Sequence, residues 1–200
     1  MSSMTLYPTL ADRTFSGRNA ALRNVALVVA GSLALWLSAK LQVPFYPVPM
    51  TMQTFVVLVI GTAFGWRLGA ATVALYLVEG ALGLPVFAGT PEKGIGLAYM
   101  VGPTGGYLLG YLPAAALCGF LASCGWDRRI ATMALSMLLG TVVIYAFGLA
   151  WLGSIVGWDK PVLAWGLYPF VLGDLLKLAL AAAVLPMAWR LSGGRPGGSL

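Results

Sequence analysis

The sequence predicts an all-α integral membrane protein with six transmembrane helices. Three observations support this fold class. Of the 200 residues, 60% are hydrophobic and only 9% are charged, whereas soluble domains carry about 25% charged residues. The apolar residues form six stretches, which are separated by short segments rich in glycine, proline or charge. The cations are distributed unevenly between these segments, which is typical of a membrane topology.

The apolar stretches define the expected domain organisation. We place the spans at residues 20–41, 51–65, 68–83, 104–125, 130–152 and 169–191. They form a single membrane domain, 20–191, flanked by an N-terminal tail, 1–19, and a C-terminal tail, 192–200. The second span would reach only about 22 Å as a helix, short of a hydrocarbon core of about 30 Å. A helix that stops at a cavity would explain this length, and tilting against neighbours would explain it equally well.

Two connecting segments have the composition of ordered structure. Residues 41–50 contain three prolines, which fix φ and remove backbone donors, so we expect a rigid, extended loop. Residues 84–103 are rich in glycine and proline but remain apolar, unlike a solvated linker. We therefore expect this second loop to fold over the membrane domain as a lid.

The cations indicate the orientation of the spans. One side of the alternating topology would hold eight of them, Arg13, Arg18, Arg23, Arg67, Arg128, Arg129, Arg190 and Arg195. The other side would hold three, Lys40, Lys93 and Lys160. By the positive-inside rule, both termini are expected to be cytoplasmic. The two ordered loops and the first half of the last span then share the outer side, which predicts a binding pocket that opens outward. The scattered cations form no basic stripe, so the net charge of +6 does not indicate nucleic-acid binding.

The last span carries two ionisable residues, Asp174 and Lys177. A charged side chain in the middle of a membrane costs roughly 2.5–3.5 kcal/mol, so each needs a partner or a polar cavity. Their i, i+3 spacing places them on one helical face. They could form an internal ion pair that only neutralises itself, or a ligand site in which the lysine holds a carboxylate and the aspartate accepts N–H donors. We favour a ligand site for a small solute with an amide and an acid group.

Other polar and aromatic residues are weaker candidates for the same pocket. Gln53 either starts its helix or offers one acceptor and two donors to the ligand. Thr104 is expected as an N-cap, and Phe87, Tyr99 and Tyr107 as apolar walls. Glu79 lies near the outer end of its span, where it either reaches water or joins the site.

A stripe of small residues marks the first span. Ala26, Ala30 and Ala34 repeat every four residues, and such faces let helices approach closely. The stripe could pack within this chain or dock onto a separate membrane subunit.

Several motifs that would indicate an enzyme are absent from the sequence. There is no histidine and no GxxxxGK[ST] phosphate loop, and we find no nucleophile–base pair. The two cysteines, Cys118 and Cys124, are interpreted as packing residues. We therefore expect no catalysis, no metal site and no cofactor.

Four stretches in combination resemble the BioY family, the biotin-specific substrate-capture (S) components of energy-coupling factor (ECF) transporters. They are PVPMTMQT (47–54), GLPVFAG (83–89), GPTGGYLLG (102–110) and DLLK (174–177). The resemblance implies a six-helix S-component fold in a bacterial plasma membrane and an outward biotin pocket. It also implies two kinds of partner, a transmembrane coupling protein and a pair of ABC-type ATPases that use the ATP.

The resemblance also assigns roles to residues. The family's acid and lysine correspond to Asp174, suited to the ureido N–H groups of biotin, and Lys177, suited to its valerate carboxylate. Gln53 corresponds to the family's glutamine. The alanine stripe corresponds to the face that docks on the coupling subunit. Some members use a loop asparagine that this chain lacks, and backbone around Gly89 or Thr104 is expected to take its place.

Two other hypotheses remain open at this stage. One is an autonomous secondary transporter for biotin or a similar small carboxylate, with Asp174 and Lys177 as coupling groups. The absence of an obvious inverted repeat speaks against it. The other is a structural membrane protein in which the ion pair fixes helix register.

Overall fold

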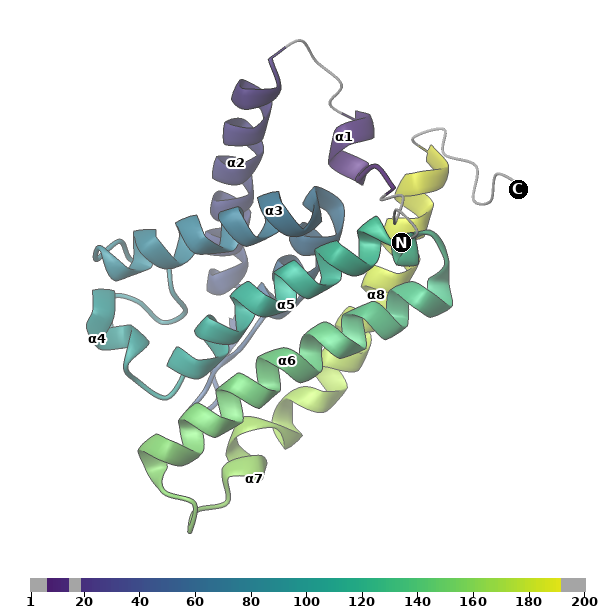
Figure 1. Ribbon diagram of the computed structural model, residues 1–200. Helices are drawn as coiled ribbons and strands as arrows, with labels where there is room; N and C mark the ends of the chain where they lie inside the picture. Colours follow the sequence, from purple (N-terminus) through teal and green to yellow (C-terminus); the bar gives the residue numbers. More distant parts are fainter. Residues whose placement is uncertain (1–6, 15–18, 192–200) are drawn as a thin grey trace, which may run out of the picture.

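The computed structural model describes residues 7–14 and 19–191, with the side chains of residues 190 and 191 excepted. In chain order the elements are α1 (Leu10–Thr14), α2 (Ala20–Lys40), β1 (Gln42–Val43), β2 (Met50–Thr51), α3 (Gln53–Ala81), α4 (Gly96–Met100), α5 (Gly105–Ser123), the 3-10 turn η1 (Trp126–Arg128), α6 (Ile130–Val156), α7 (Val162–Gly166) and α8 (Tyr168–Leu191) (Figure 1). The predicted C-terminal tail, 192–200, lies outside the described residues, as do Arg18 and Arg195. The predicted N-terminal tail contains α1, whose Ala11 is buried.

Five segments of the described chain are long and apolar enough to cross a membrane. They are α2, α3, α5, α6 and the segment Val162–Trp189, which combines α7 with most of α8. The sequence predicts six spans, and the difference lies in α3. This element contains both the second and the third predicted span, because it continues through a bend at Gly65.

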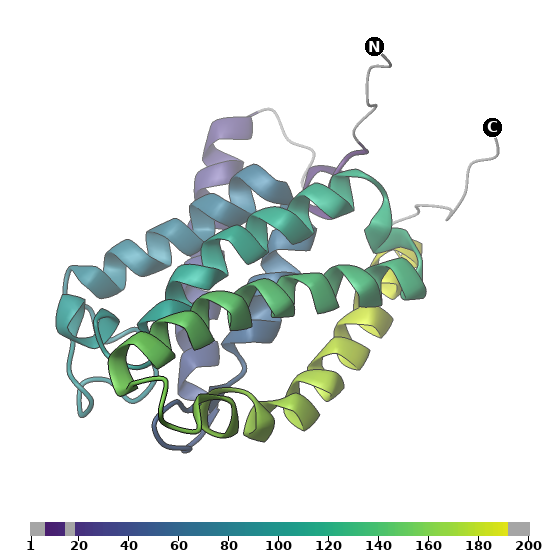
Figure 2. The ribbon, with the colours of Figure 1, turned by 60° about the horizontal axis from the view of Figure 1, so that its bottom comes forward.

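The bend in α3 depends on glycine. Gly65 has φ 80° and ψ 169°, a conformation that side chains with a Cβ avoid. Beyond the bend the two limbs of α3 approach backbone to backbone, since a Cβ on Gly69 would lie 2.8 Å from the Cα of Gly61. Figure 2 shows the limbs running in clearly different directions. The short lengths of the two predicted spans therefore reflect a helix that turns back on itself.

Helix α5 occupies the centre of the bundle, with α3 on one side and α6 on the other (Figure 2). Small residues make these contacts close: Gly61 of α3 meets the backbone of Ala115, and Gly106 of α5 meets the side chain of Trp151. Such small-residue contacts are typical of helices packed in membranes, where apolar side chains gain little by leaving lipid. Helix α8 packs against α6 and the first limb of α3, which brings its ionisable residues to the bundle interior.

Helix α2 is held mainly by one face, which packs on α3. Its buried residues are Gly31, Ser32, Leu35, Ser38 and Ala39. Ala26 and Ala30 are exposed, and Ala34 is half-buried. The alanine stripe is thus not the face that packs within this chain. Ser32 donates its hydroxyl hydrogen to Glu79, so Glu79 ties α3 to α2 rather than only reaching water.

The two predicted loops are both ordered. The proline-rich loop, 41–50, begins and ends in the short antiparallel pair β1–β2, in which Gln42 faces Thr51. These four strand residues are a small departure from the predicted all-α class. In the second loop, Val86, Phe87 and Ala88 are buried against the bundle, and α4 follows them.

Candidate functional site

A cavity lies where β2 and the start of α3 meet α5, α6 and the first turns of α8. It encloses about 570 Å³ of empty space, including the part that is open to solvent. Six of the seven residues predicted for the ligand site line it, namely Gln53, Tyr99, Thr104, Tyr107, Asp174 and Lys177.

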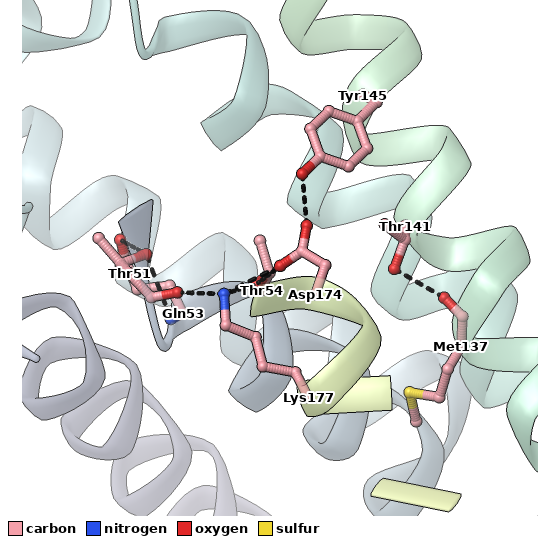
Figure 3. A network of polar contacts seen from close by, with 8 residues as sticks. All are labelled: Thr51, Gln53, Thr54, Met137, Thr141, Tyr145, Asp174 and Lys177. Atoms are coloured by element: carbon pink, nitrogen blue, oxygen red, sulfur yellow. Dashed lines mark hydrogen bonds and ion pairs between the residues drawn. The ribbon is translucent and has the colours of Figure 1, made fainter. Parts of the chain in front are cut away.

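Asp174 and Lys177 both line this cavity, and their side chains point toward each other (Figure 3). Nζ of Lys177 lies 2.9 Å from Oδ1 of Asp174, and the two side chains are 11% and 10% exposed. The i, i+3 spacing does place both on one face of α8, while Leu175 and Leu176 between them are exposed on the other. The pair is therefore turned away from the surface that lipid would cover.

The end of β2 and the first turn of α3 supply the remaining partners of Lys177. Its Nζ donates to the backbone oxygen of Thr51 at 2.7 Å and to Oγ1 of Thr54 at 3.1 Å. Together with the bond to Asp174, these contacts use all three ammonium protons. Thr54 lies in the first turn of α3, where the helix dipole favours negative charge. The local electrostatics thus suit the Asp174 carboxylate or another anion nearby.

Asp174 is also held from α6. Tyr145 donates its hydroxyl hydrogen to Oδ2, so both carboxylate oxygens accept hydrogen bonds. Tyr145 in turn packs edge-to-face on Tyr107, with ring centroids 6.2 Å apart. Tyr107 donates to the backbone oxygen of Gly166 at 2.8 Å, which fixes the ring against α7. The result is a rigid aromatic wall beside a charged pair.

Gln53 lines the cavity while its amide is engaged elsewhere. It is 3% exposed, and its Nε2 donates to the hydroxyl of Tyr76. The hydroxyl of Tyr76 in turn donates a hydrogen bond to the backbone oxygen of Val86 at 3.0 Å. Gln53 therefore both starts α3 and links the cavity to the loop after that helix, so the two interpretations of this residue are compatible.

Phe87 requires a correction, because it does not line the cavity. The side chain is fully buried between Tyr76 and Tyr99, and its ring stacks on Tyr99 with centroids 5.1 Å apart. Tyr99 is the ring that reaches the cavity wall. Phe87 is predicted as an apolar wall of the site, whereas its ring packs one layer behind the predicted wall residue Tyr99.

Thr104 lines the cavity at the N-cap position of α5, but its side chain makes no capping hydrogen bond. The hydroxyl is thus not used in the way the sequence suggests. Of the two groups expected to replace the missing asparagine, Thr104 lines the cavity, and in the backbone around Gly89 the neighbouring Ala88 lines it while Gly89 itself does not.

A second, smaller hollow lies against the other side of the charged pair. It shares Thr54, Thr141, Asp174 and Lys177 with the main cavity and continues between Phe55, Leu58, Met137 and Leu178. The Asp174–Lys177 pair therefore separates two hollows within the described bundle.

Comparison with known families decides the class of this chain. The model of the BioY family matches residues 11–194, nearly the whole sequence. The chain belongs to the BioY family.

Individual relatives agree with this assignment. A protein of Pyrococcus horikoshii named as a probable biotin transporter is 37% identical over 171 residues, covering 86% of this chain and 97% of the relative. A biotin transporter of Thermotoga maritima is 39% identical over 159 residues, covering 80% of this chain and 87% of the relative. The crystal structure of the S-component for biotin from an ECF-type ABC transporter has the same fold, with a TM-score of 0.71 at 22% identity over 87% of this chain and 94% of that one. This BioY-family chain is therefore a helical membrane protein of a transporter family with the S-component fold.

Some cavity residues of this BioY-family chain were missed in the sequence. Thr51 and Thr54 flank Gln53 in the quoted PVPMTMQT stretch, and this spacing around a polar helix start was the available signal. Tyr145 lies in the middle of an apolar span, where a hydroxyl needs a partner. Tyr111 and Phe170 also line the cavity, and nothing in their sequence context separates them from ordinary packing aromatics.

Proposed function

We propose that this chain is the biotin-binding S component of an ECF-type transporter in a prokaryotic plasma membrane. The observation that carries the proposal is the cavity of a BioY-family chain in which Asp174 and Lys177 lie side by side among aromatic walls. The relatives' names support biotin as the ligand. The chain itself would carry out no chemistry and hold no cofactor.

The geometry of the charged pair refines how biotin would bind. The two ends of biotin are separated by its thiophane ring and a chain of four methylene groups. Asp174 and Lys177 are in contact at 2.9 Å, so they suit one end of the ligand better than both. A ureido group has a carbonyl oxygen that can replace Thr54 as an acceptor of Lys177, and it has N–H groups that can donate to Asp174. We therefore place the ureido ring at the pair and direct the valerate group toward the cavity mouth. The residue-by-residue assignment from the sequence gave each residue a different end.

The proposed topology has six crossings with both termini cytoplasmic. The two limbs of α3 would cross separately, since they diverge at Gly65. Arg13 of α1 stacks over the ring of Trp189 of α8, which supports one membrane side for the first and last helices. Lys40, Lys93 and Lys160 would then be outside, on the same side as the mouth of the cavity.

The proposed partners are a transmembrane coupling protein and ABC-type ATPases, which would use the ATP. The exposed Ala26 and Ala30, with Ala34 at the edge of the contact with α3, support docking of the coupling protein on α2. An Ala30→Trp variant should then fail to co-purify with the coupling protein while it still binds biotin. Undiminished co-purification would refute this docking surface.

The alternative of an autonomous secondary transporter draws on one observation, the two hollows on either side of the charged pair. Biotin uptake that survives deletion of the ATPase partners but stops with an uncoupler would favour it. Uptake that requires the ATPases would favour the S-component proposal.

The deciding experiment for the proposal is a titration of the purified full-length chain with biotin in detergent. Seven tryptophans provide an intrinsic fluorescence signal, and equilibrium dialysis gives the bound fraction independently. Saturable binding that is lost in Lys177→Ala supports the site. The matched control is Lys160→Ala, which removes a lysine from an exposed ion pair with Asp159 and should bind as well as wild type. No binding by either method would refute the biotin proposal.

A further inference from the structure

The ammonium group of Lys40, at the end of α2, is bonded to a segment of another part of the chain. Nζ donates to the backbone oxygens of Pro85 at 2.9 Å, Phe87 at 3.1 Å and Thr90 at 3.3 Å, and to Oγ1 of Thr90 at 3.1 Å. Four acceptors share three protons, and all of them belong to residues 85–90. The lysine thus holds this segment mainly by its backbone, since three of the four acceptors are backbone oxygens.

Residues 85–90 form part of the wall of the main cavity. Ala88 lines the cavity directly. Phe87 lies behind Tyr99, which also lines it, and the two rings are stacked. The backbone oxygen of Val86 accepts from Tyr76, which is itself bonded to Gln53 at the cavity. A displacement of this segment would therefore shift the aromatic wall and the polar group beside it.

Helix α2 does not line the cavity. Lys40 at its end is nevertheless bonded to residues 85–90, which form part of the cavity wall. Apart from the contact with α3, much of the length of α2 is exposed, including Leu22, Val25, Val29 and Leu33. Lys40 is itself exposed, but Val86, Phe87 and Ala88 of the segment that it holds are buried, and close packing transmits displacements of such a segment to its neighbours. The clamp made by Lys40 is thus a connection between an exposed helix and the ligand cavity.

We propose that Lys40 is a positioning residue that locks residues 85–90 to the end of α2, so that α2 and this wall of the cavity move as one unit. The inference rests on the proposed function only where it invokes biotin. A contact on the exposed face of α2, such as the coupling protein, then changes the affinity for the ligand. By linkage, the ligand changes the affinity of α2 for that partner by the same factor.

The test compares Lys40→Met with wild type by hydrogen exchange of the purified full-length chain. Without ligand, amides in residues 84–95 should exchange roughly tenfold faster in Lys40→Met than in wild type. The loop should open more easily because its charge-assisted hydrogen bonds to Lys40 are lost. Biotin affinity should fall by roughly threefold to tenfold. In wild type, biotin should slow exchange at residues 33–41, and this effect should vanish in the variant. Lys40→Gln, which keeps a shorter donor, serves as the second variant should the methionine variant unfold.

The control is Lys93→Met, since Lys93 is an exposed lysine on the same loop. It should leave all three readouts unchanged. Unaltered exchange of residues 84–95 in both Lys40 variants would overturn the inference even if wild type binds biotin. Biotin protection at 33–41 that persists in the variants would overturn the link to α2. Loosening of the loop in a chain that does not bind biotin would refute the proposed function and still support the positioning role.

Discussion

Tyr145 on α6 donates its hydroxyl hydrogen to Oδ2 of Asp174 on α8. Oδ1 of the same carboxylate accepts from Lys177 on its own helix. Each oxygen is thus held from a different direction, and the orientation of the carboxylate in the cavity is defined before any ligand enters. A preorganised acceptor of this kind avoids the ordering cost that binding otherwise carries.

Replacing Tyr145 with phenylalanine should weaken biotin binding by roughly tenfold. The change removes one hydrogen bond to a charged group, which contributes about 1.5 kcal/mol or more, and leaves Oδ2 without its fixed donor. Equilibrium dialysis with labelled biotin measures the effect. Tyr168→Phe is the matched control, because Tyr168 is 63% exposed on α8. Equal affinities for Tyr145→Phe and wild type would show that orientation of the carboxylate does not matter.

The ion pair itself should behave differently in single and double variants. Asp174→Asn or Lys177→Met leaves an uncompensated charge in a site that is about one-tenth exposed, and should lower stability by about 3 kcal/mol. The double variant contains neither charge, so its loss should be clearly smaller than the sum of the two. Thermal unfolding in detergent gives the stabilities, and all three variants should bind biotin much more weakly than wild type.

An exposed ion pair provides the control for this comparison of single and double variants. Asp159 and Lys160 are 72% and 52% exposed, and such pairs contribute about 0–1 kcal/mol. Their single and double variants should unfold close to wild type. Additive losses at Asp174 and Lys177 would mean that the two charges do not compensate each other, contrary to the 2.9 Å contact.

Much of the helical architecture could be predicted because bilayer-spanning segments need about 20 apolar residues, and such stretches are visible in the sequence. The second predicted span ended at Gly65, where the structure has its bend. Whether a bend breaks a helix into two or leaves one kinked element depends on hydrogen bonds across it, and composition does not reveal these. The β1–β2 pair was missed for a related reason, since two-residue strands carry no periodicity.

Residues of the candidate site could be predicted where a charged side chain lies in an apolar span, because burying such a charge in a membrane costs free energy. Asp174 and Lys177 stand out in an apolar span, and the structure places them together in the cavity. Phe87 illustrates the limit, because an apolar ring in an apolar loop packs equally well against a ligand or against Tyr99. Tyr145 was missed because the sequence of an apolar span does not show which group a hydroxyl in it meets, and only the approach of α6 to α8 reveals its partner.

The end of biotin that meets the ion pair can be identified with an ester. Biotin methyl ester keeps the ureido ring but lacks the valerate charge. If the ureido ring occupies the pair, the ester should bind within about fivefold of biotin, and Lys177→Met should weaken both ligands equally. If Lys177 holds the carboxylate instead, the ester should bind to wild type as poorly as biotin binds to the variant. Competition against labelled biotin measures both affinities.

Asp127 lies outside the spans, in η1, and its environment makes stability depend on pH. The residue is 2% exposed, and burial raises the pKa of its carboxyl above the usual 3.8, although the bond from Trp189 and the nearby charge of Arg128 oppose this. Among the described residues, no donor reaches its Oδ1. The folded chain thus holds the proton more tightly than the unfolded chain. The resulting stabilisation is fully present below the unfolded pKa and is lost as pH rises through the raised folded pKa.

Asp127→Asn should remove this dependence, because the amide is neutral at every pH and its oxygen can still accept from Trp189. The unfolding temperature of the variant minus that of wild type should therefore increase from pH 4 to pH 8. Taking the difference cancels the titration of the other carboxylates, and Asp159→Asn, on an exposed side chain, should show no such trend. A difference that stays constant or falls with pH would mean that the buried carboxyl remains ionised in the folded chain. Arg128, whose guanidinium lies over the rings of Tyr7 and Trp189, would then be the group that stabilises the charge.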